Sequence, residues 1–292
     1  MSLIRRLRVP LGLALTALLF LPALASASTE FDPAEEFDVG KWVNIDLGPI
    51  DLSINKAVVY MLVSSAIAII GGILVVRGGL RMRPTKGQNV VELVYEFTEK
   101  QVAGATLPPR VFRKWFPYLA TLFIFIAINN LISFIPLPFG PHKDTFDILG
   151  DLGLYAATAN INVTLALAIC TFVCFLWEGF TTHGFIGYFR TLVPPGAGGA
   201  IKPFIFALEF LSQLLRLVSL SVRLFANMLA GHLLIIMAAG FSILVGSLAG
   251  VLGIPFALFF YVFEWVLVAG LQAFIFALLS GIYIGYAAME EH

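Results

Sequence analysis

Apolar residues run through this chain in stretches long enough to cross a lipid bilayer. A perpendicular helix needs about 20 such residues, and 57–76, 116–135 and 155–177 are stretches of that kind without any charged residue. Two more apolar segments, 204–245 and 255–289, each predict a single helix. The pattern is typical of an all-α polytopic membrane protein with five transmembrane helices.

The last two predicted helices are longer than a bilayer requires. They contain 42 and 35 residues, which corresponds to about 63 Å and about 52 Å of helix. Such helices either tilt far beyond the ordinary ~20° or extend outside the membrane. Because the turn at 246–253 is uncharged, we favour two overlong, strongly tilted helices that form a membrane-embedded hairpin.

One segment has helical periodicity but is too polar to cross the membrane. Between 88 and 102 the apolar side chains fall on one helical face and the polar ones on the other. The apolar set is Val90, Leu93, Val94 and Phe97, and the polar set is Glu92, Glu96, Glu99 and Lys100. This segment is expected to form an amphipathic helix that lies along the membrane surface.

The N-terminus has the pattern of a signal peptide. Arg5, Arg6 and Arg8 precede the apolar run 9–24, and small residues that suit signal peptidase follow it. An uncleaved anchor is the alternative, although the run has only 16 residues and includes two prolines. We therefore expect a signal peptide at 1–27, an extracytoplasmic segment at 28–56 and a membrane domain at 57–292.

The distribution of basic residues predicts the topology. Lysine and arginine are densest between 77 and 114, and such regions stay on the cytoplasmic side. With five spans, the mature N-terminus then lies outside and the C-terminus lies in the cytoplasm. A cleavable secretory signal indicates the bacterial plasma (inner) membrane. The loop after the third span, with Glu178, His183 and Arg190, is expected inside.

Composition excludes several classes of function. The chain is 59% hydrophobic and only 12% charged, with a net charge of zero, which argues against a nucleic-acid partner. Cys170 and Cys174 do not form a CxxC pair and lack further metal ligands nearby, so they are expected to be small buried hydrophobes. No GxxxxGK[ST] motif is present. We expect no cofactor, no metal and no catalytic residue.

One charged residue inside the fourth span needs an explanation. Arg223 stays ionised at any plausible pH, and at the centre of a membrane helix it costs at least ~2.5–3.5 kcal/mol. No further charged residue follows until Glu264. This isolation predicts a functional charge whose partner belongs to another protein.

Other polar residues share the face of Arg223. Glu209, Arg216 and Arg223 are seven residues apart, so each step drifts by only about 20° around the helix. Ser219 and Asn227 follow the same stripe. An alternative for Glu209 and Arg216 is that they only neutralise each other near a helix end.

His232 lies nine residues after Arg223 and is therefore expected on the opposite face of the helix. On its own it would be read as a hydrogen-bonded interior histidine. Glu264 and Gln272 recur at a spacing of eight on the next helix. Because imidazole and carboxyl groups can both titrate, Glu264 favours a proton path.

These residues carry a resemblance that covers most of the chain. The stretch 219–232, which reads SLSVRLFANMLAGH, resembles subunit a of the F-type ATP synthases, together with QAFIF at 272–276 and EEH at 290–292. The resemblance implies a proton-translocating, non-catalytic subunit that provides two half-channels and couples proton flow to rotation. The implied partners are the c-ring, subunit b of the peripheral stalk and the remaining complex.

The resemblance also implies roles for single residues. Arg223 would face the c-ring carboxylate with Gln272 beside it. Asn227, His232 and Glu264 would line the outer half-channel, and Glu209 the inner one. The chain is similar to the subgroup with histidine first and glutamate second. In that subgroup the glutamate is expected seven residues before Gln272, where this chain has Trp265.

Two other classes of function are alternatives. A secondary transporter or antiporter could use Arg223 to bind an anion, but it would need a substrate cavity and usually an internal repeat, and no repeat is visible. A purely structural membrane scaffold would leave Arg223 unexplained.

Overall fold

The computed structural model describes residues 41–43, 46–47, 50–51, 53–78, 84–135, 155–193, 201–244, 255 and 258–289. The predicted signal peptide and the C-terminal 290–292 lie outside the described residues. The chain divides into two compact units, one of 39–232 with 262–292 and one of 1–38 with 233–261. Every contact discussed below lies within the first unit.

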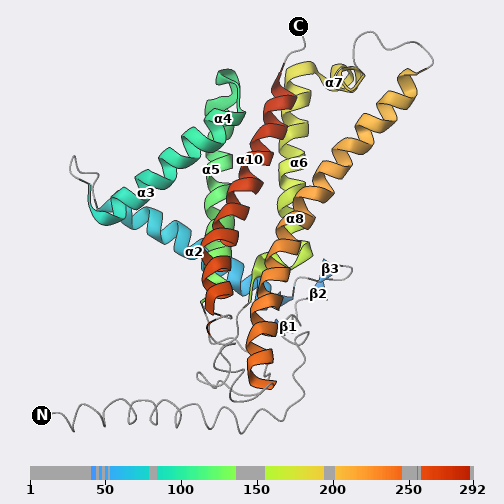
Figure 1. The fold of residues 1–292 in the computed structure, drawn as a ribbon. Helices are drawn as coiled ribbons and strands as arrows, with labels where there is room; N and C mark the ends of the chain where they lie inside the picture. Colours follow the sequence, from blue (N-terminus) through green and yellow to red (C-terminus); the bar gives the residue numbers. More distant parts are fainter. Residues whose placement is uncertain are drawn as a thin grey trace, which may run out of the picture. The chain divides into compact units, whose positions relative to one another are not determined.

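The five predicted spans are confirmed as helices that are long and apolar enough to cross a membrane (Figure 1). They are α2 (Lys56–Arg77), α5 (Pro109–Ile132), α6 (Ile161–His183), α8 (Lys202–Leu244) and the run Leu258–Ala288, which contains η4 (Glu264–Val268) and α10 (Ala269–Ala288). The all-α polytopic class is therefore shown.

Short strands that the sequence analysis did not predict precede α2. β1 (Lys41–Val43) pairs with β4 (Ile54–Asn55), and β2 (Asp46–Leu47) pairs with β3 (Ile50–Asp51), both antiparallel. Asn55 then caps α2, because its side chain accepts a hydrogen bond from the Val58 amide at 3.0 Å.

The starts of α5 and α6 differ from the prediction by several residues. α5 begins at Pro109, seven residues before the expected start, because proline fits the first turn of a helix. α6 begins only at Ile161, since the Asn160 side chain caps it by accepting from the Asn162 amide at 3.0 Å. The residues before it form a buried 3-10 turn, η3 (Ala157–Ala159).

Glu178 was expected in the loop after the third span, and this prediction is wrong. It lies within α6 and is buried. Its Oε2 accepts from the Trp115 indole at 2.8 Å and from the Lys114 ammonium, both on α5. The two donors satisfy the buried carboxylate, so Glu178 does not need to lie in a solvated loop. A short helix, α7 (Phe185–Thr191), follows.

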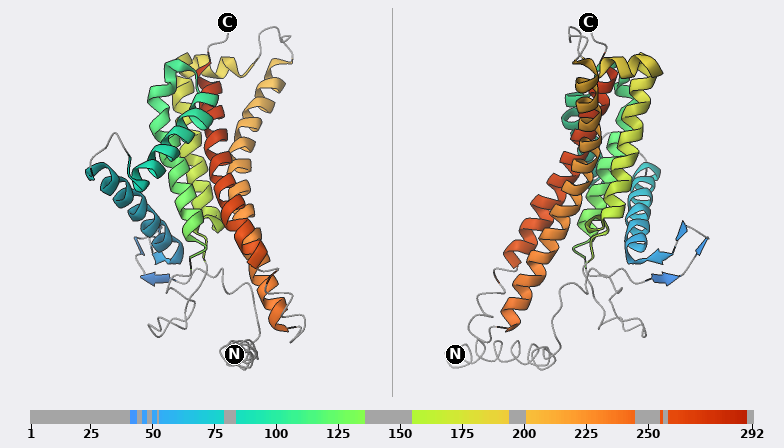
Figure 2. Two further views of the ribbon diagram at one scale, coloured as in Figure 1. Left: turned by 60° about the vertical axis from the view of Figure 1, so that its left-hand side comes forward. Right: turned by 90° about the vertical axis from the view of Figure 1, so that its right-hand side faces the viewer.

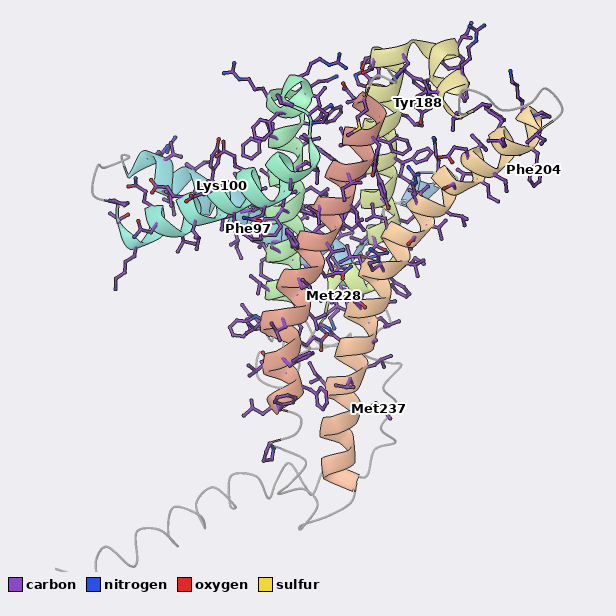
Figure 3. The ribbon with its side chains drawn as sticks, turned by 45° about the horizontal axis from the view of Figure 1, so that its top comes forward. Phe97, Lys100, Tyr188, Phe204, Met228 and Met237 are labelled. Atoms are coloured by element: carbon purple, nitrogen blue, oxygen red, sulfur yellow. The ribbon has the colours of Figure 1, made fainter. Side chains whose placement is uncertain are left out.

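The amphipathic segment forms a helix of its own, α3 (Lys86–Phe97), which continues through η2 (Thr98–Ala103) and α4 (Gly104–Thr106). At its end the Phe97 ring lies 5.5 Å from the Phe274 ring of α10, whereas Lys100 points away from the bundle (Figure 3). A hydrogen bond from Lys100 lowers the pKa of the exposed Glu96.

The core is built around α10, which packs along both α5 and α6. Leu119, Ala277 and Ile284 are completely buried there. Gly285 lies so close to α4 that a Cβ atom would overlap the carbonyl oxygen of Thr106. Small residues allow such close helix contacts in membrane proteins.

α8 is the most open of the last four spans. Only 11% of its most apolar stretch is buried in the protein, against 44% for α5. α8 runs obliquely to α6 and diverges from α10 toward α7 (Figures 1 and 2). At that end the Tyr188 hydroxyl of α7 donates to Gln213 Oε1 at 2.9 Å. Burial raises the pKa of Tyr188, so the hydroxyl keeps the proton that it donates.

Candidate functional site

Arg223 lies on the open side of α8. The neighbouring Leu220, Leu224 and Met228 form the buried side of the helix, while Arg223 itself is exposed. Among the residues that the structure describes, its guanidinium makes no hydrogen bond and no ion pair. A permanent charge in an apolar helix is thus left without a partner inside this part of the chain.

Arg216, two turns earlier on the same face, is different. Its Nη2 lies 3.6 Å from Glu209 Oε1, and its guanidinium lies over the Tyr283 ring, 5.7 Å from the ring centre. The neutralisation considered for Glu209 and Arg216 therefore occurs in the structure. It does not extend to Arg223. Ser219 lies exposed between the two arginines.

Asn227 and Gln272 connect the face of Arg223 with α10. Asn227 follows Arg223 by one helical turn, and its Nδ2 donates to Gln272 Oε1 at 2.6 Å. Gln272 is buried, and its own amide nitrogen lacks a partner among the described residues. A buried donor of this kind is costly unless it meets an acceptor, so it is available to a further polar group.

His232 and Glu264 form a buried pair. Each is only 2% exposed, and His232 Nδ1 lies 3.4 Å from Glu264 Oε1. The same Nδ1 lies 3.1 Å from the carbonyl oxygen of Met228, on the stretch of α8 that runs beside α10 (Figure 3). Phe134, in the turn after α5, packs on the imidazole with ring centres 4.9 Å apart.

Several polar atoms of this pair are unsatisfied. Nε2 of His232 and both carboxylate oxygens of Glu264 are buried without a hydrogen bond to any described residue. Two adjacent titratable groups with free lone pairs can pass a proton between them. Gly231 makes the arrangement possible, since a Cβ atom there would overlap the Glu264 carboxylate.

A π-helical turn explains why Glu264, not Trp265, reaches His232. Eight residues of regular α-helix turn about 80° beyond two full turns, which would separate the faces of Glu264 and Gln272. However, Glu264 begins the π-helical turn η4, in which the Ala269 amide donates to the carbonyl oxygen of Glu264, five residues earlier. Such a turn accommodates one extra residue. Glu264 and Gln272 therefore both face α8, while Trp265 is 40% exposed.

Other residues around the pair were not predicted from the sequence. Asn130 and Thr158 are buried and joined by a 2.7 Å hydrogen bond, and Phe134 and Gly231 contact His232 and Glu264 as described. Asn130 could have been singled out from the sequence because it is a polar residue inside the second span. Nothing in the sequence indicated which helix it contacts.

The fold and the site define a class of protein: a multi-pass membrane protein with an arginine on one helix that has no partner among the described residues, and a buried histidine–glutamate pair further along the same helix. Comparisons with known proteins identify the family. The model of the family "ATP synthase A chain" matches residues 58–285. ATP synthase subunit a of Brucella canis is 34% identical over 268 residues, which is 89% of this chain and 99% of the relative. The subunits a of Brucella suis and Brucella abortus match to the same extent.

The chain belongs to the ATP synthase A chain family. It is the proton-translocating stator subunit of the membrane sector, not the catalytic part of the complex. This membership replaces the alternative of a secondary transporter.

Proposed function

We propose that Arg223 faces the carboxylate of a rotating c-ring and that protons reach and leave this carboxylate by two offset half-channels. The observation that carries the proposal is the difference between two arginines on one face of α8. Arg216 is paired with Glu209, whereas Arg223 is exposed and lacks a partner among the described residues.

Electrostatics gives Arg223 its role. A protonated carboxyl group is neutral and can pass through lipid on a rotor. An opposite charge within about 4–6 Å lowers a carboxyl pKa by about 1–3 units, so the rotor group releases its proton when it meets the guanidinium. Arginine effectively cannot lose its own proton. The fixed charge therefore keeps the rotor carboxylate ionised between the two half-channels.

The outer half-channel is assigned to His232, Glu264 and Asn227, with Gln272 beside Arg223. His232 is nine residues from Arg223 along α8, a rise of about 13.5 Å. The Asn227–Gln272 hydrogen bond lies between the pair and the arginine. Protons entering at the pair would then reach the rotor next to Arg223.

The inner half-channel is assigned to the part of α8 that lies N-terminal to Arg223. Glu209 lies 14 residues before Arg223, about 21 Å along the helix. Glu209, Arg216 and Ser219 form a supporting polar stripe on that side. Each proton that crosses 100 mV releases about 2.3 kcal/mol, so several protons are needed for each ATP.

The remaining assignments concern the surroundings of the chain. The open side of α8 would meet the c-ring, and subunit b of the peripheral stalk and the rest of the complex would contact other faces. The protein would lie in the bacterial plasma membrane, with the mature N-terminus outside and the C-terminus in the cytoplasm. Residues 1–27 would be removed as a signal peptide.

Cysteine cross-linking tests the face of α8 that meets the rotor. After replacement of Cys170 and Cys174, Ala226→Cys places a thiol on the open side, next to Arg223 in helical position. Met228→Cys is the matched control, because Met228 is completely buried. Ala226→Cys should cross-link to a cysteine beside the c-ring carboxylate and Met228→Cys should not. A cross-link from 228 alone would overturn the proposed orientation.

A further inference from the structure

One buried amide on α5 joins three elements next to the histidine–glutamate pair. Asn130 is completely buried, and its Nδ2 donates to the carbonyl oxygen of Ala269 at 3.2 Å. Its Oδ1 accepts from the Thr158 hydroxyl of η3 at 2.7 Å. Asn130 thus connects α5 and η3 with the first residue of α10.

The hydrogen bond from Asn130 to Ala269 lies at the end of the π-helical turn. Ala269 closes the π-helical turn, because its amide donates to the carbonyl oxygen of Glu264. The amide of Asn130 therefore holds the residue at which the π-helical turn ends and the regular helix resumes. The orientation of Glu264 depends on where this junction lies.

A residue just beyond α5 contacts the other member of the pair. Phe134 lies in the turn that follows α5 and packs on the imidazole of His232, with ring centres 4.9 Å apart. The end of α5 and the turn after it therefore contact both sides of the pair: Asn130 contacts the helix that carries Glu264, and Phe134 contacts His232.

We propose that Asn130 is a positioning residue, which fixes the π-helical turn in the register that brings the Glu264 carboxylate to His232. The proposal rests on the proposed function of this pair in the proton path. π-Helical turns are rare and occur as single-turn insertions in α-helices. Relaxation to a regular α-helix would rotate Glu264 away from Gln272 by about 80° and bring Trp265 to the side that faces α8.

The hydrogen bonds of Asn130 oppose this relaxation. If the junction moved, the buried amide of Asn130 would lose its acceptor on Ala269, and a buried donor without an acceptor is costly. Thr158 in turn fixes the orientation of the Asn130 side chain. Its hydroxyl donates to Oδ1 of Asn130, so this oxygen has to face Thr158 and the NH2 group has to face Ala269.

The experiment is a double-mutant cycle in the complete ATP synthase, reconstituted in liposomes, with proton flux measured per assembled complex. Asn130→Leu should lower the flux about fivefold. Asn129→Leu is the matched control: Asn129 is also buried, but among the described residues its amide donates only to Phe125 of its own helix, so this change should leave the flux near wild type.

Combination with Glu264→Gln separates positioning from other roles. If Asn130 acts through Glu264, Asn130→Leu should cause no further loss in a Glu264→Gln background, because coupled residues are not additive. A full additional loss would overturn the inference. Wild-type flux in Glu264→Gln alone would instead remove Glu264 from the proposed function, so the two failures can be distinguished.

A rescue experiment addresses the π-helical turn itself. Deletion of Trp265 places Glu264 seven residues before Gln272, which a regular α-helix brings to one side. Asn130→Leu should then no longer lower the flux, whereas a general packing defect would persist. If Asn130→Leu prevents assembly, Thr158→Val tests the same connection by removing only the hydroxyl bond. Its smaller loss should also vanish with the deletion, and persistence would overturn the inference.

Discussion

Nδ1 of His232 on α8 lies 3.4 Å from Oε1 of Glu264, the first residue of η4. Both are buried, and neither carboxylate oxygen has a hydrogen-bond partner among the described residues. This relationship links the two long C-terminal helices at a point half a helical turn around α8 from Arg223.

Loss of the carboxylate should slow proton entry. Glu264→Gln keeps the shape of the side chain but removes its titration, so we expect proton-driven ATP synthesis to fall about tenfold or more while the complex assembles. The exchange His232→Glu with Glu264→His should restore part of the rate, because the pair is kept. Trp265→Leu, at the exposed neighbouring position, serves as control. Synthesis at the wild-type rate in Glu264→Gln would exclude this residue from the path.

Gly231 offers a test that leaves both titratable groups in place. Gly231→Ala adds a Cβ atom where the Glu264 carboxylate lies, so the carboxylate must move away and the proton flux should approach that of Glu264→Gln. Gly270→Ala is the matched control, because a Cβ atom at Gly270 would meet nothing within 4 Å. Flux measurements on assembled complexes compare the two. Equal rates for both variants and the wild type would show that the carboxylate position is unimportant.

The π-helical turn predicts how the last helix tolerates a change in length. Insertion of one alanine after Val268 adds a second extra residue and turns Glu264 by about 100° relative to α10. The pair should separate, and the flux should fall as in Glu264→Gln. The same insertion after Met289, beyond the end of α10, is the control. A fully active chain with the insertion after Val268 would contradict the structural account of this turn.

Much of the fold was predictable because a bilayer restricts what can cross it. Uncharged stretches of about 20 residues have to be helices in lipid, and the five spans follow from that rule. The start of α6 was misplaced because 155–160 carries no charge, yet Ala157–Ala159 form a buried 3-10 turn and Asn160 then caps α6. Glu178 was misplaced because the two donors that satisfy its carboxylate, Lys114 and Trp115, come from a different helix.

The candidate site was predictable in part for the same kind of reason. Helical periodicity correctly separates the face of Arg223 from that of His232. The spacing of eight between Glu264 and Gln272 was visible, but the place of the extra residue was not. A π-helical turn is stabilised by tertiary contacts, here the bond between Asn130 and Ala269, which no local pattern records. The functional roles of these residues stay predictions.

The central claim is that Arg223 supplies a permanent positive charge. Lysine at this position would keep a positive charge, but a buried lysine can lose its proton, and its compact ammonium lacks the planar five-donor fork of arginine. Arg216→Lys is the matched control, since Arg216 is partly exposed and already paired with Glu209.

The decisive measurement is ATP synthesis by membranes that carry Arg223→Lys under an imposed proton gradient. The complex should assemble in normal amount and synthesise essentially no ATP, while Arg216→Lys should retain most of its activity. Synthesis by Arg223→Lys at a rate near wild type would contradict the proposed mechanism at its centre.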